Sequence, residues 1–380
     1  MQIKSHLFRS AIAIVLGSSL FSGCLPNPAT VQSRHSYTMP AETKLGAHTH
    51  DTKLEFKSQP ASIVAGQPSI WLLKVLKTKK NPDTKQEEPV KEFTVVHEKI
   101  MHLVVVSKDL SWFNHIHPDY KDNGLFLIRM VLPRPGTYKL YADYTPKDGR
   151  QEVPQCEFNV VSSPAPNAQP VSFEPTARSA ITADAPKGGV ITKQIAALPE
   201  DEPQDESKTE VKTAAGPAYQ IELVPPSQLR AEESTLLHFH VLDANGKEVT
   251  DLQPYLGAMG HAVILSADTN IYLHTHPISN DTALQMLSQQ KGAMPKINNS
   301  DVFFPLLFPK AGIYKIWAQF RHHDQLITAP FTLKVGAAAK AANVGTANTL
   351  YVCPMHPEET STQPNQTCPK CGMPLIQKTK

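Results

Sequence analysis

Short runs in which apolar residues alternate with polar ones recur along most of the chain and predict β-strands. Runs rich in β-branched and aromatic residues lie at residues 69–75, 103–106, 126–132, 138–144 and 157–161. Gly, Pro, Asp and Asn separate these runs, as is typical of turns between strands. Helical periodicity is nearly absent, and the pattern therefore predicts a mainly β protein. The one helix that we expect lies at residues 281–290.

Two long parts of the chain are similar to each other. Residues 102–118 align without a gap to residues 261–277, at a constant offset of 159 (261 − 102). Residues 133–142 match residues 309–318 at an offset of 176 (309 − 133), so the second copy carries 17 more residues (176 − 159), within about 278–300. A duplication with so long a period indicates two similar domains rather than a solenoid of stacked repeats.

We therefore predict two tandem antiparallel β-sandwich domains, of immunoglobulin or cupredoxin type, at residues 51–162 and 217–336. About seven short strands per hundred residues, with turns between them, are typical of this architecture. Residues 163–216 are rich in Pro, Ala and charged residues, which predicts a disordered linker between the domains. The Gly- and Ala-rich residues 337–348 are expected to be a hinge before a small C-terminal domain at residues 349–380.

The C-terminal segment carries two pairs of residues that commonly bind metals. Cys353 and His356 form the first pair, and Cys368 and Cys371 form the second, with eleven residues between the pairs. A two-residue spacer lets both donors of a pair point at one tetrahedral ion. The segment is too short for a hydrophobic core, so much of its folding free energy would come from the metal.

The donor set leaves the choice of metal open. Three thiolates and one imidazole suit Zn(II), whereas the thioethers of Met355 and Met373 suit Cu(I) or Ag(I). Two other interpretations are a purely structural zinc ribbon and an oxidised disulfide between Cys368 and Cys371. Spacing alone does not decide between these metals.

The same segment resembles a known family. Its residues match the pattern Tyr-x-Cys-Pro-Met-His-Pro followed by Cys-Pro-x-Cys-Gly-Met-x-Leu from Tyr351 to Leu375. This pattern is that of the small heavy-metal-binding domain found on heavy-metal efflux components and copper-transporting ATPases. The resemblance implies metal binding, and it implies efflux components as partners.

Each copy also places three histidines where one β-hairpin can gather them. Residues two apart on a strand share a face, so His115 and His117 point the same way. If the hairpin turns at residues 109–110, His102 lies opposite His117 on that face. A one-residue slip would remove His102 from it. The same arithmetic about a turn at residues 268–269 gathers His261, His274 and His276.

Three imidazoles in one neighbourhood suit a Zn(II) or copper site with an open position. We favour the second copy, because Met259 lies on a Gly-rich approach to His261. In the alternative interpretation, the duplicated His-x-His-Pro motif caps a strand and serves the fold. His238 and His240 share one strand face and are expected to support the ligands, whereas residues 322–323 are expected at a solvated hairpin tip.

The long segments also resemble two-domain periplasmic proteins associated with copper or heavy metals. The resemblance rests on Met-Gly-His and His-x-His-Pro in the sandwich, with Phe-Pro-x-x-Gly-x-Tyr-Lys-x-Trp after them. It covers about residues 216–336 well and residues 51–162 less well. It implies metal handling and does not identify a reaction.

The N-terminus predicts export. Basic residues precede an apolar stretch at residues 11–20, which is too short to span a membrane as an ordinary helix. The small residues that follow, and then Cys24, resemble a bacterial lipobox. The resemblance implies a lipoprotein signal peptide at residues 1–23, a lipid on Cys24 and a flexible tether at residues 24–50. The residue after the cysteine, Leu25, is similar to an outer-membrane sorting signal. The alternative is an ordinary secretory peptide.

Composition narrows the function further. The formal net charge of +2 argues against a nucleic-acid partner. Among five cysteines, Cys156 is left without an obvious partner and is expected to be a small buried strand residue. The chain has no Gly-x-Ser-x-Gly, phosphate-loop or His-Glu-x-x-His motif, so we do not expect an enzyme.

Together these features predict an exported, lipid-anchored metal-binding protein at the periplasmic face of the bacterial outer membrane. It would capture, buffer or transfer a transition-metal ion, with copper favoured over zinc or silver. A membrane contact would come from the lipid anchor. The alternative is a structural or protein-interaction envelope lipoprotein whose tail is stapled by zinc.

Overall fold

The computed structural model describes both repeats and the C-terminal segment. Apart from residues 23–24, the expected signal peptide and tether, and most of the expected hinge, lie outside the described residues. Those residues are 23–24, 52–78, 87–147, 149–162, 182–186, 190–199, 218–288, 297–339 and 349–378.

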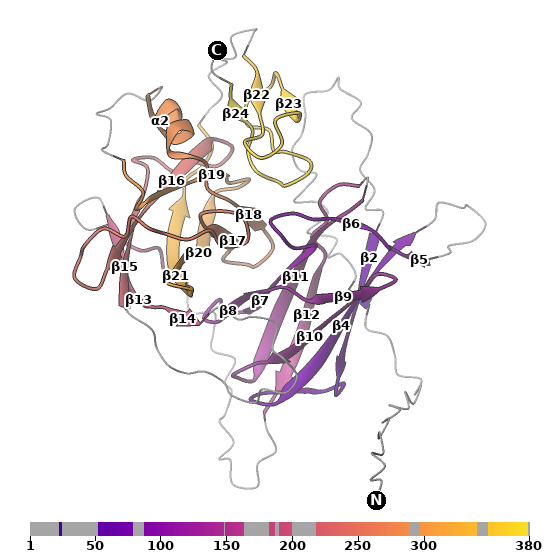
Figure 1. The fold of residues 1–380 in the computed structure, drawn as a ribbon. Coiled ribbons are helices and arrows are strands. Elements are labelled where there is room, and N and C mark those ends of the chain that lie inside the picture. The colour runs from indigo at the N-terminus through magenta and orange to yellow at the C-terminus, as the bar shows by residue number, and fades with distance from the viewer. Residues whose placement is uncertain are drawn as a thin grey trace, which may run out of the picture.

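The first repeat folds into two sheets that pack face to face (Figure 1). Trp71, Phe126 and Leu140 fill the space between them and are fully buried. The described pairs are antiparallel except for β3 with β12. One sheet has the order β1 (Gly23–Cys24), β2 (Thr52–Gln59), β4 (Pro68–Thr78), β10 (Leu125–Val131) and β9 (Asp119–Asp122), with β5 (Glu87–Pro89) on β4; the other has the order β3 (Ile63–Val64), β12 (Gln155–Val161), β11 (Gly136–Pro146), β7 (Met101–Ser107) and β8 (Phe113–Ile116), with β6 (Phe93–Thr94) on β11.

The second repeat has the same two-layer plan and a larger aromatic core. Phe239, Phe304, Phe320 and Phe331 are fully buried between its sheets. The predicted helix is confirmed as α2 (Asn280–Ser288), in the 17-residue insertion. One sheet has the order β13 (Ile191–Ala196), β15 (Ala218–Val224), β16 (Ser234–Asp243) and β19 (Asp301–Leu307); the other has the order β14 (Leu198–Pro199), β21 (Gln325–Val335), β20 (Gly312–His322), β17 (His261–Ser266) and β18 (Tyr272–Thr275).

The prediction of a mainly β chain with antiparallel sandwiches is confirmed. The interpretation of residues 163–216 as one disordered linker is wrong in part, because β13 and β14 lie within it and pair with β15 and β21. Averaging composition over the whole segment concealed a short run in which Ile191 and Ile195 alternate with polar residues. Such a run gains its stability from the sheet edge on which it lies and not from its own composition.

Cys156 also differs from expectation. It lies in β12 and is buried, as predicted, with 9% of its surface exposed. However, it is disulfide-bonded rather than unpaired.

The two repeats pack against each other through β7 and β8 of the first and β17 and β18 of the second. Side chains of β7 alternate between two environments, because successive residues of a strand point to opposite faces. Leu103 and Val105 lie in the core of the first sandwich, whereas Val104 and Val106 contact the second repeat. Both faces of this sheet are therefore buried, and His102 lies on the face that meets the other repeat.

Aromatic pairs close the same interface. The rings of Phe113 and Trp317 stack with centroids 4.5 Å apart and planes 9° apart. Tyr141 stacks on Tyr272 at 5.1 Å and donates a hydrogen bond to the Thr269 carbonyl at 2.7 Å. The contact between the repeats is therefore an apolar core of its own, with named partners on each side.

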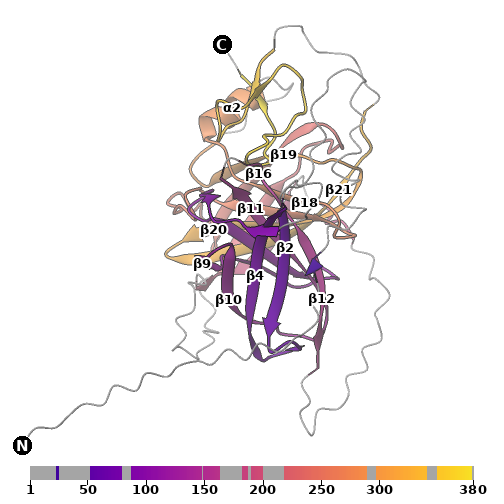
Figure 2. The same ribbon diagram turned by 90° about the vertical axis from the view of Figure 1, so that its right-hand side faces the viewer.

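The C-terminal segment forms a small three-stranded sheet at one end of the molecule, above both sandwiches (Figures 1 and 2). No helix within the described ranges has the length and apolar character needed to cross a membrane. The strands of this sheet are β22 (Tyr351–Val352), β23 (Thr360–Ser361) and β24 (Ile376–Gln377).

Candidate metal centres

The C-terminal cassette brings its four predicted ligands together. The donor atoms of Cys353, His356, Cys368 and Cys371 all lie within 4.8 Å of one another. Cys353 Sγ lies 3.6 Å from Cys371 Sγ, and His356 Nδ1 lies 3.6 Å from Cys368 Sγ. Two sulfurs bound at about 2.3 Å to one tetrahedral ion would be about 3.8 Å apart. The cluster therefore has the dimensions of a tetrahedral site, with sulfurs too far apart for a disulfide.

The three thiols are buried next to each other, and this determines their protonation. Hydrogen bonding with Cys368 raises the pKa of Cys353, and hydrogen bonding with Cys353 and Cys368 raises the pKa of Cys371. The same contacts lower the pKa of Cys368. One of the three thiols is thus favoured as a thiolate, and ionisation of the other two is opposed. A bound cation is therefore needed to hold all three as thiolates.

Methionines of the cassette differ in their surroundings. Met373 is fully buried in the same cluster as the three cysteines, together with Leu375. Met355 is 40% exposed. Only Met373 is therefore placed among the donor side chains.

The cassette rests on the first repeat near its pairing with the second. Gln151 donates its backbone N–H to the Pro369 carbonyl at 3.4 Å. Gly372, with φ 71°, lies so close that an added Cβ would be 2.7 Å from Gln151 Oε1. On the second repeat, the Ser234 hydroxyl lies 3.3 Å from the Asn365 side-chain oxygen.

Both histidine triads form with the predicted register. In the first hairpin β7 pairs with β8 so that Val104 lies opposite His115, and in the second Val263 lies opposite His274. In each triad the donor nitrogens lie within 4.8 Å of one another. The triads are His102, His115 and His117 in the first repeat, and His261, His274 and His276 in the second.

The structure adds what the hairpins alone do not show: the two triads face each other across the contact between the repeats. The ring centroids of His102 and His274 are 5.1 Å apart, and those of His115 and His274 are 5.2 Å apart. His97 joins the group, because its ring stacks on His276 at 3.4 Å. All seven imidazoles therefore lie in one continuous cluster.

Burial keeps these imidazoles neutral. Loss of solvation is the main cause that lowers the pKa of His102, His115 and His274 to about 3, and that of His97 to about 4. For His102 the neighbouring rings of His274 and His115 add to the effect. Neutral imidazole is the form that binds metals.

Two polar residues that the sequence analysis did not single out hold the histidines in place. His115 Nδ1 lies 2.8 Å from Gln319 Oε1, and His274 Nδ1 lies 3.2 Å from Asp143 Oδ2. Asp143 and Gln319 are related by the same 176-residue offset as the blocks that contain Tyr138 and Tyr314 (319 − 143). That offset could have paired Asp143 with Gln319 as equivalent residues. Which histidine each of them contacts depends on how the repeats pack.

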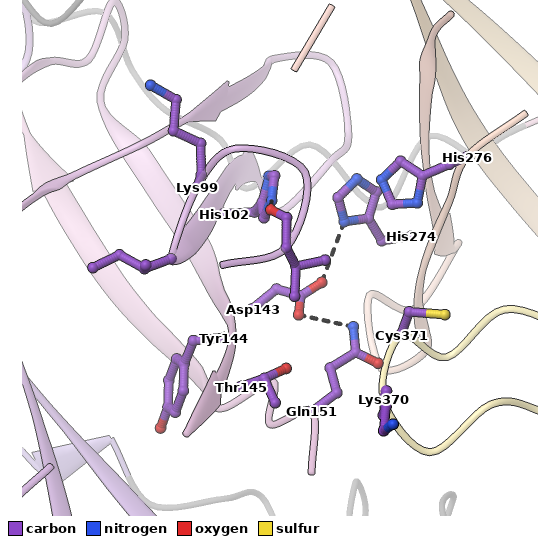
Figure 3. A pocket seen from close by; sticks show the side chains of 12 residues that line it. Lys99, His102, Asp143, Tyr144, Thr145, Gln151, His274, His276, Lys370 and Cys371 are labelled. Carbon is purple, nitrogen blue, oxygen red and sulfur yellow. Dashed lines mark hydrogen bonds and ion pairs between the residues drawn. The ribbon is translucent and has the colours of Figure 1, made fainter. Parts of the chain in front are cut away.

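A cavity connects the triads to the cassette (Figure 3). Asp143 lies between His274 and Gln151 and is hydrogen-bonded to both. Cys371 lies beside them on the cassette. The cavity is therefore lined by all three parts of the chain, namely His102 and Asp143, His274 and His276, and Lys370 and Cys371.

Other predicted residues have different environments. Met259 is 41% exposed. His238 and His240 form a separate group, and both contact Asp301 Oδ1, at 2.6 Å and 3.0 Å. The expectation that the hairpin tip is solvated is wrong for His322, which is 7% exposed and lies 2.7 Å from the Tyr219 hydroxyl.

Models of two protein families match parts of this chain. A model of the family "Domain of unknown function (DUF8832)" matches residues 41–162 and 212–337, and the chain belongs to this family. A model described as "Heavy metal binding domain" matches residues 350–378. The C-terminal segment is thus a heavy-metal-binding domain, as its motif predicted. No curated protein matches the chain.

Solved structures match the chain only weakly. The Escherichia coli adhesin FdeC is 11% identical, with 77% of this chain and 66% of that chain covered and a TM-score of 0.21. Carbohydrate-binding modules of the β-sandwich superfamily are 12% identical, with 76% and 100% covered and a TM-score of 0.18. The Parabacteroides merdae β-glucuronidase is 9% identical, with 75% and 24% covered and a TM-score of 0.17. The chain therefore spans just under two thirds of the adhesin and about a quarter of the glucuronidase. Such low scores carry no argument about function.

Proposed function

We propose that this protein captures a soft or borderline transition-metal ion in the bacterial cell envelope and buffers or transfers it. The observation that carries the proposal is the set of four donors of the cassette, which lie within 4.8 Å of one another with the three cysteines almost fully buried. A buried Cys3His set has no other evident role in a segment whose small core consists largely of those ligands.

Copper is the favoured metal, with zinc or silver next. Three thiolates and a buried thioether at Met373 form a donor set that suits Cu(I) and Ag(I), whereas His356 also suits Zn(II). Every one of these ions would be cargo or a structural ion bound by the same residues.

Transfer is supported by the position of the cassette on the body. Cys371 lines the same cavity as His274 and His276, so a residue of the cassette borders a space that two triad histidines also border. An ion that leaves the thiolates would meet nitrogen donors at once, at a high effective concentration. We propose a binding and exchange role rather than catalysis.

The envelope location rests on the N-terminal pattern. A lipid on Cys24 and the disulfide at Cys156 exclude each other, because the other three of the five cysteines are free thiols, so Cys156 is a thiol in the lipidated protein. Attachment to the outer membrane through a lipid on Cys24, and contact with heavy-metal efflux components, follow the resemblances of the two ends of the chain.

Metal analysis of the purified chain tests the function. The wild-type protein is expected to bind Cu(I) or Zn(II) in competition with a chromophoric chelator. The double variant Cys368→Ser/Cys371→Ser should lose one equivalent. Ser361→Ala, in the same small sheet but without a donor atom in the cluster, is the matched control. Equal stoichiometry in the wild type and the double variant would overturn the proposal.

A further inference from the structure

His276 is buried without a hydrogen-bond partner. Only 2% of its surface is exposed, and neither Nδ1 nor Nε2 has a partner among the described residues. Burying polar nitrogens without compensation costs free energy, so such groups are rare and call for an explanation. One nitrogen of His276 lies within 4.8 Å of a nitrogen of His261 and of a nitrogen of His274.

The hydrogen bonds around that triad fix where the protons are. His261 Nε2 lies 2.9 Å from the Tyr255 carbonyl oxygen, which can only accept, so this nitrogen carries the N–H. His274 Nδ1 lies 3.2 Å from the Asp143 carboxylate, so it also carries an N–H. The remaining nitrogens, His261 Nδ1 and His274 Nε2, are 3.3 Å apart and each presents a lone pair. Two neutral imidazoles cannot form a hydrogen bond in this arrangement.

The first triad repeats the arrangement. His102 Nε2 faces the Val96 carbonyl at 3.0 Å and His115 Nδ1 faces Gln319 Oε1 at 2.8 Å, so both of these nitrogens donate. Their other nitrogens face each other at 3.1 Å. His117 Nε2 lies 3.2 Å from His102 Nδ1, where it can donate, so this triad is partly satisfied without an ion.

A metal ion satisfies both triads. Three imidazoles bound at about 2.0–2.1 Å to one tetrahedral ion have nitrogens about 3.3 Å apart. Metal-binding histidines commonly donate their other N–H to a carbonyl or carboxylate, which fixes the ring. Four of the six histidines show this second contact.

Each triad is oriented by the opposite repeat. The carboxylate of Asp143, on β11 of the first repeat, holds His274 of the second. The amide of Gln319, on β20 of the second repeat, holds His115 of the first. Neither repeat alone therefore contains a complete set of ligands and supporting groups.

From this geometry we infer that the two repeats together form a paired metal centre, with one ion in each three-histidine triad, separate from the C-terminal cassette. It would take divalent ions that prefer nitrogen, such as Zn(II) or Cu(II), whereas the cassette offers sulfur. The inference rests on the proposed function and deepens it, since this centre would be the acceptor for a Zn(II) ion released by the cassette, a transfer that needs no change of oxidation state. The second triad fills first, because only there is a histidine left with both nitrogens unsatisfied.

The test uses the full chain with Cys353→Ser, Cys368→Ser and Cys371→Ser, which remove the thiol ligands of the cassette. This variant is called the cassette-silenced chain. Zn(II) is titrated against a chromophoric chelator, and the loaded protein is studied by X-ray absorption. We expect two equivalents of zinc, an all nitrogen or oxygen shell and the scattering pattern of imidazole. Adding His276→Ala should remove the tighter equivalent, and adding His117→Ala the weaker one. Glu157→Gln removes a carboxylate whose side chain is 50% exposed and that lies outside every group of candidate ligands, so this control should keep both.

Failure of the paired metal centre can be distinguished from failure of metal binding by the cassette. A silenced chain that binds no zinc stoichiometrically, or one ion shared by both triads, would overturn the paired centre, while the wild-type cassette could still bind its own ion. If His276→Ala does not fold, as judged by circular dichroism, His276→Gln replaces it. Loss of the tighter equivalent in that variant supports the inference, and retention of both overturns it.

Discussion

Asp143 and Gln319 occupy equivalent positions in the two repeats, and each accepts a hydrogen bond from a histidine of the other repeat. In its own repeat each also lies opposite the first histidine of the triad, Asp143 opposite His102 and Gln319 opposite His261. The relationship is reciprocal, so a change on one side is expected to act on the metal ligands of the other side.

Asp143→Asn is expected to weaken Zn(II) binding at the second triad by about 10- to 100-fold, since supporting contacts of this kind have effects of that size. Loss of the carboxylate removes the charge that favours the Nδ1–H form of His274. Competition titration of the cassette-silenced chain measures the change. Asp119→Asn, at a carboxylate whose side chain is 56% exposed, is the control. Unchanged affinity in Asp143→Asn would contradict the role assigned to this residue.

Trp317→Ala is expected to loosen the contact between the repeats. The indole is 4% exposed and stacks on Phe113, and replacement of a buried Trp by Ala typically costs about 3–5 kcal/mol. Denaturant unfolding measures the loss of stability. Since each triad depends on the opposite repeat, zinc affinity should fall at both triads. Trp112→Ala removes an indole that packs on Tyr138 within the first repeat, and should leave the zinc affinity nearly unchanged.

Metal-free protein is expected to lose stability as the pH falls below about 6.5. Burial holds the pKa of His102, His115 and His274 at about 3 in the folded chain, against an ordinary histidine value of 6.5. Between these values the unfolded chain binds more protons, so stability rises with pH and is complete above 6.5. Each such group contributes a slope of about 1.4 kcal/mol per pH unit. Thermal unfolding in chelator at pH 7.5 and pH 5 tests this, and an unfolding temperature that rises on acidification would refute it.

Chelation is expected to unfold the cassette while leaving the sandwiches folded. The core of the cassette consists of its three cysteines, Met373 and Leu375, so the metal supplies most of its folding free energy. Amide hydrogen exchange should accelerate across residues 351–377 on removal of the metal. Exchange in β20, within the aromatic core of the second repeat, should not change. Protection of the cassette in the absence of metal would show that it folds on its own.

Cys24→Ser is expected to abolish lipid attachment. Cells fed a labelled fatty acid should label the wild-type chain, and the variant should leave the membrane fraction. Cys156→Ser is the control, because it alters the other cysteine outside the cassette. A peptide with Cys24 linked to Cys156 in a non-reducing digest would contradict the prediction, since a thiol in a disulfide cannot carry a lipid.

Local features of the chain were predictable because they depend on neighbouring residues. Alternation of apolar and polar residues located the strands 69–75 and 138–144 within observed strands, and turn residues fixed the register of both histidine hairpins. The spacing of Cys353, His356, Cys368 and Cys371 specified the cassette. A short segment offers few alternative ways to gather these side chains.

Tertiary structure alone decided how these parts meet. Nothing local distinguishes Val104, which contacts the other repeat, from Val105, which lies in its own core, because both are apolar and both are buried. The role of β13 as an edge strand likewise depends on the sheet that it joins. The amino-acid sequence by itself determined two histidine hairpins and one metal cassette. Packing of two sheets that are buried on both faces placed the six triad histidines, Asp143 and Gln319 in one cluster, since such contacts join residues more than a hundred positions apart.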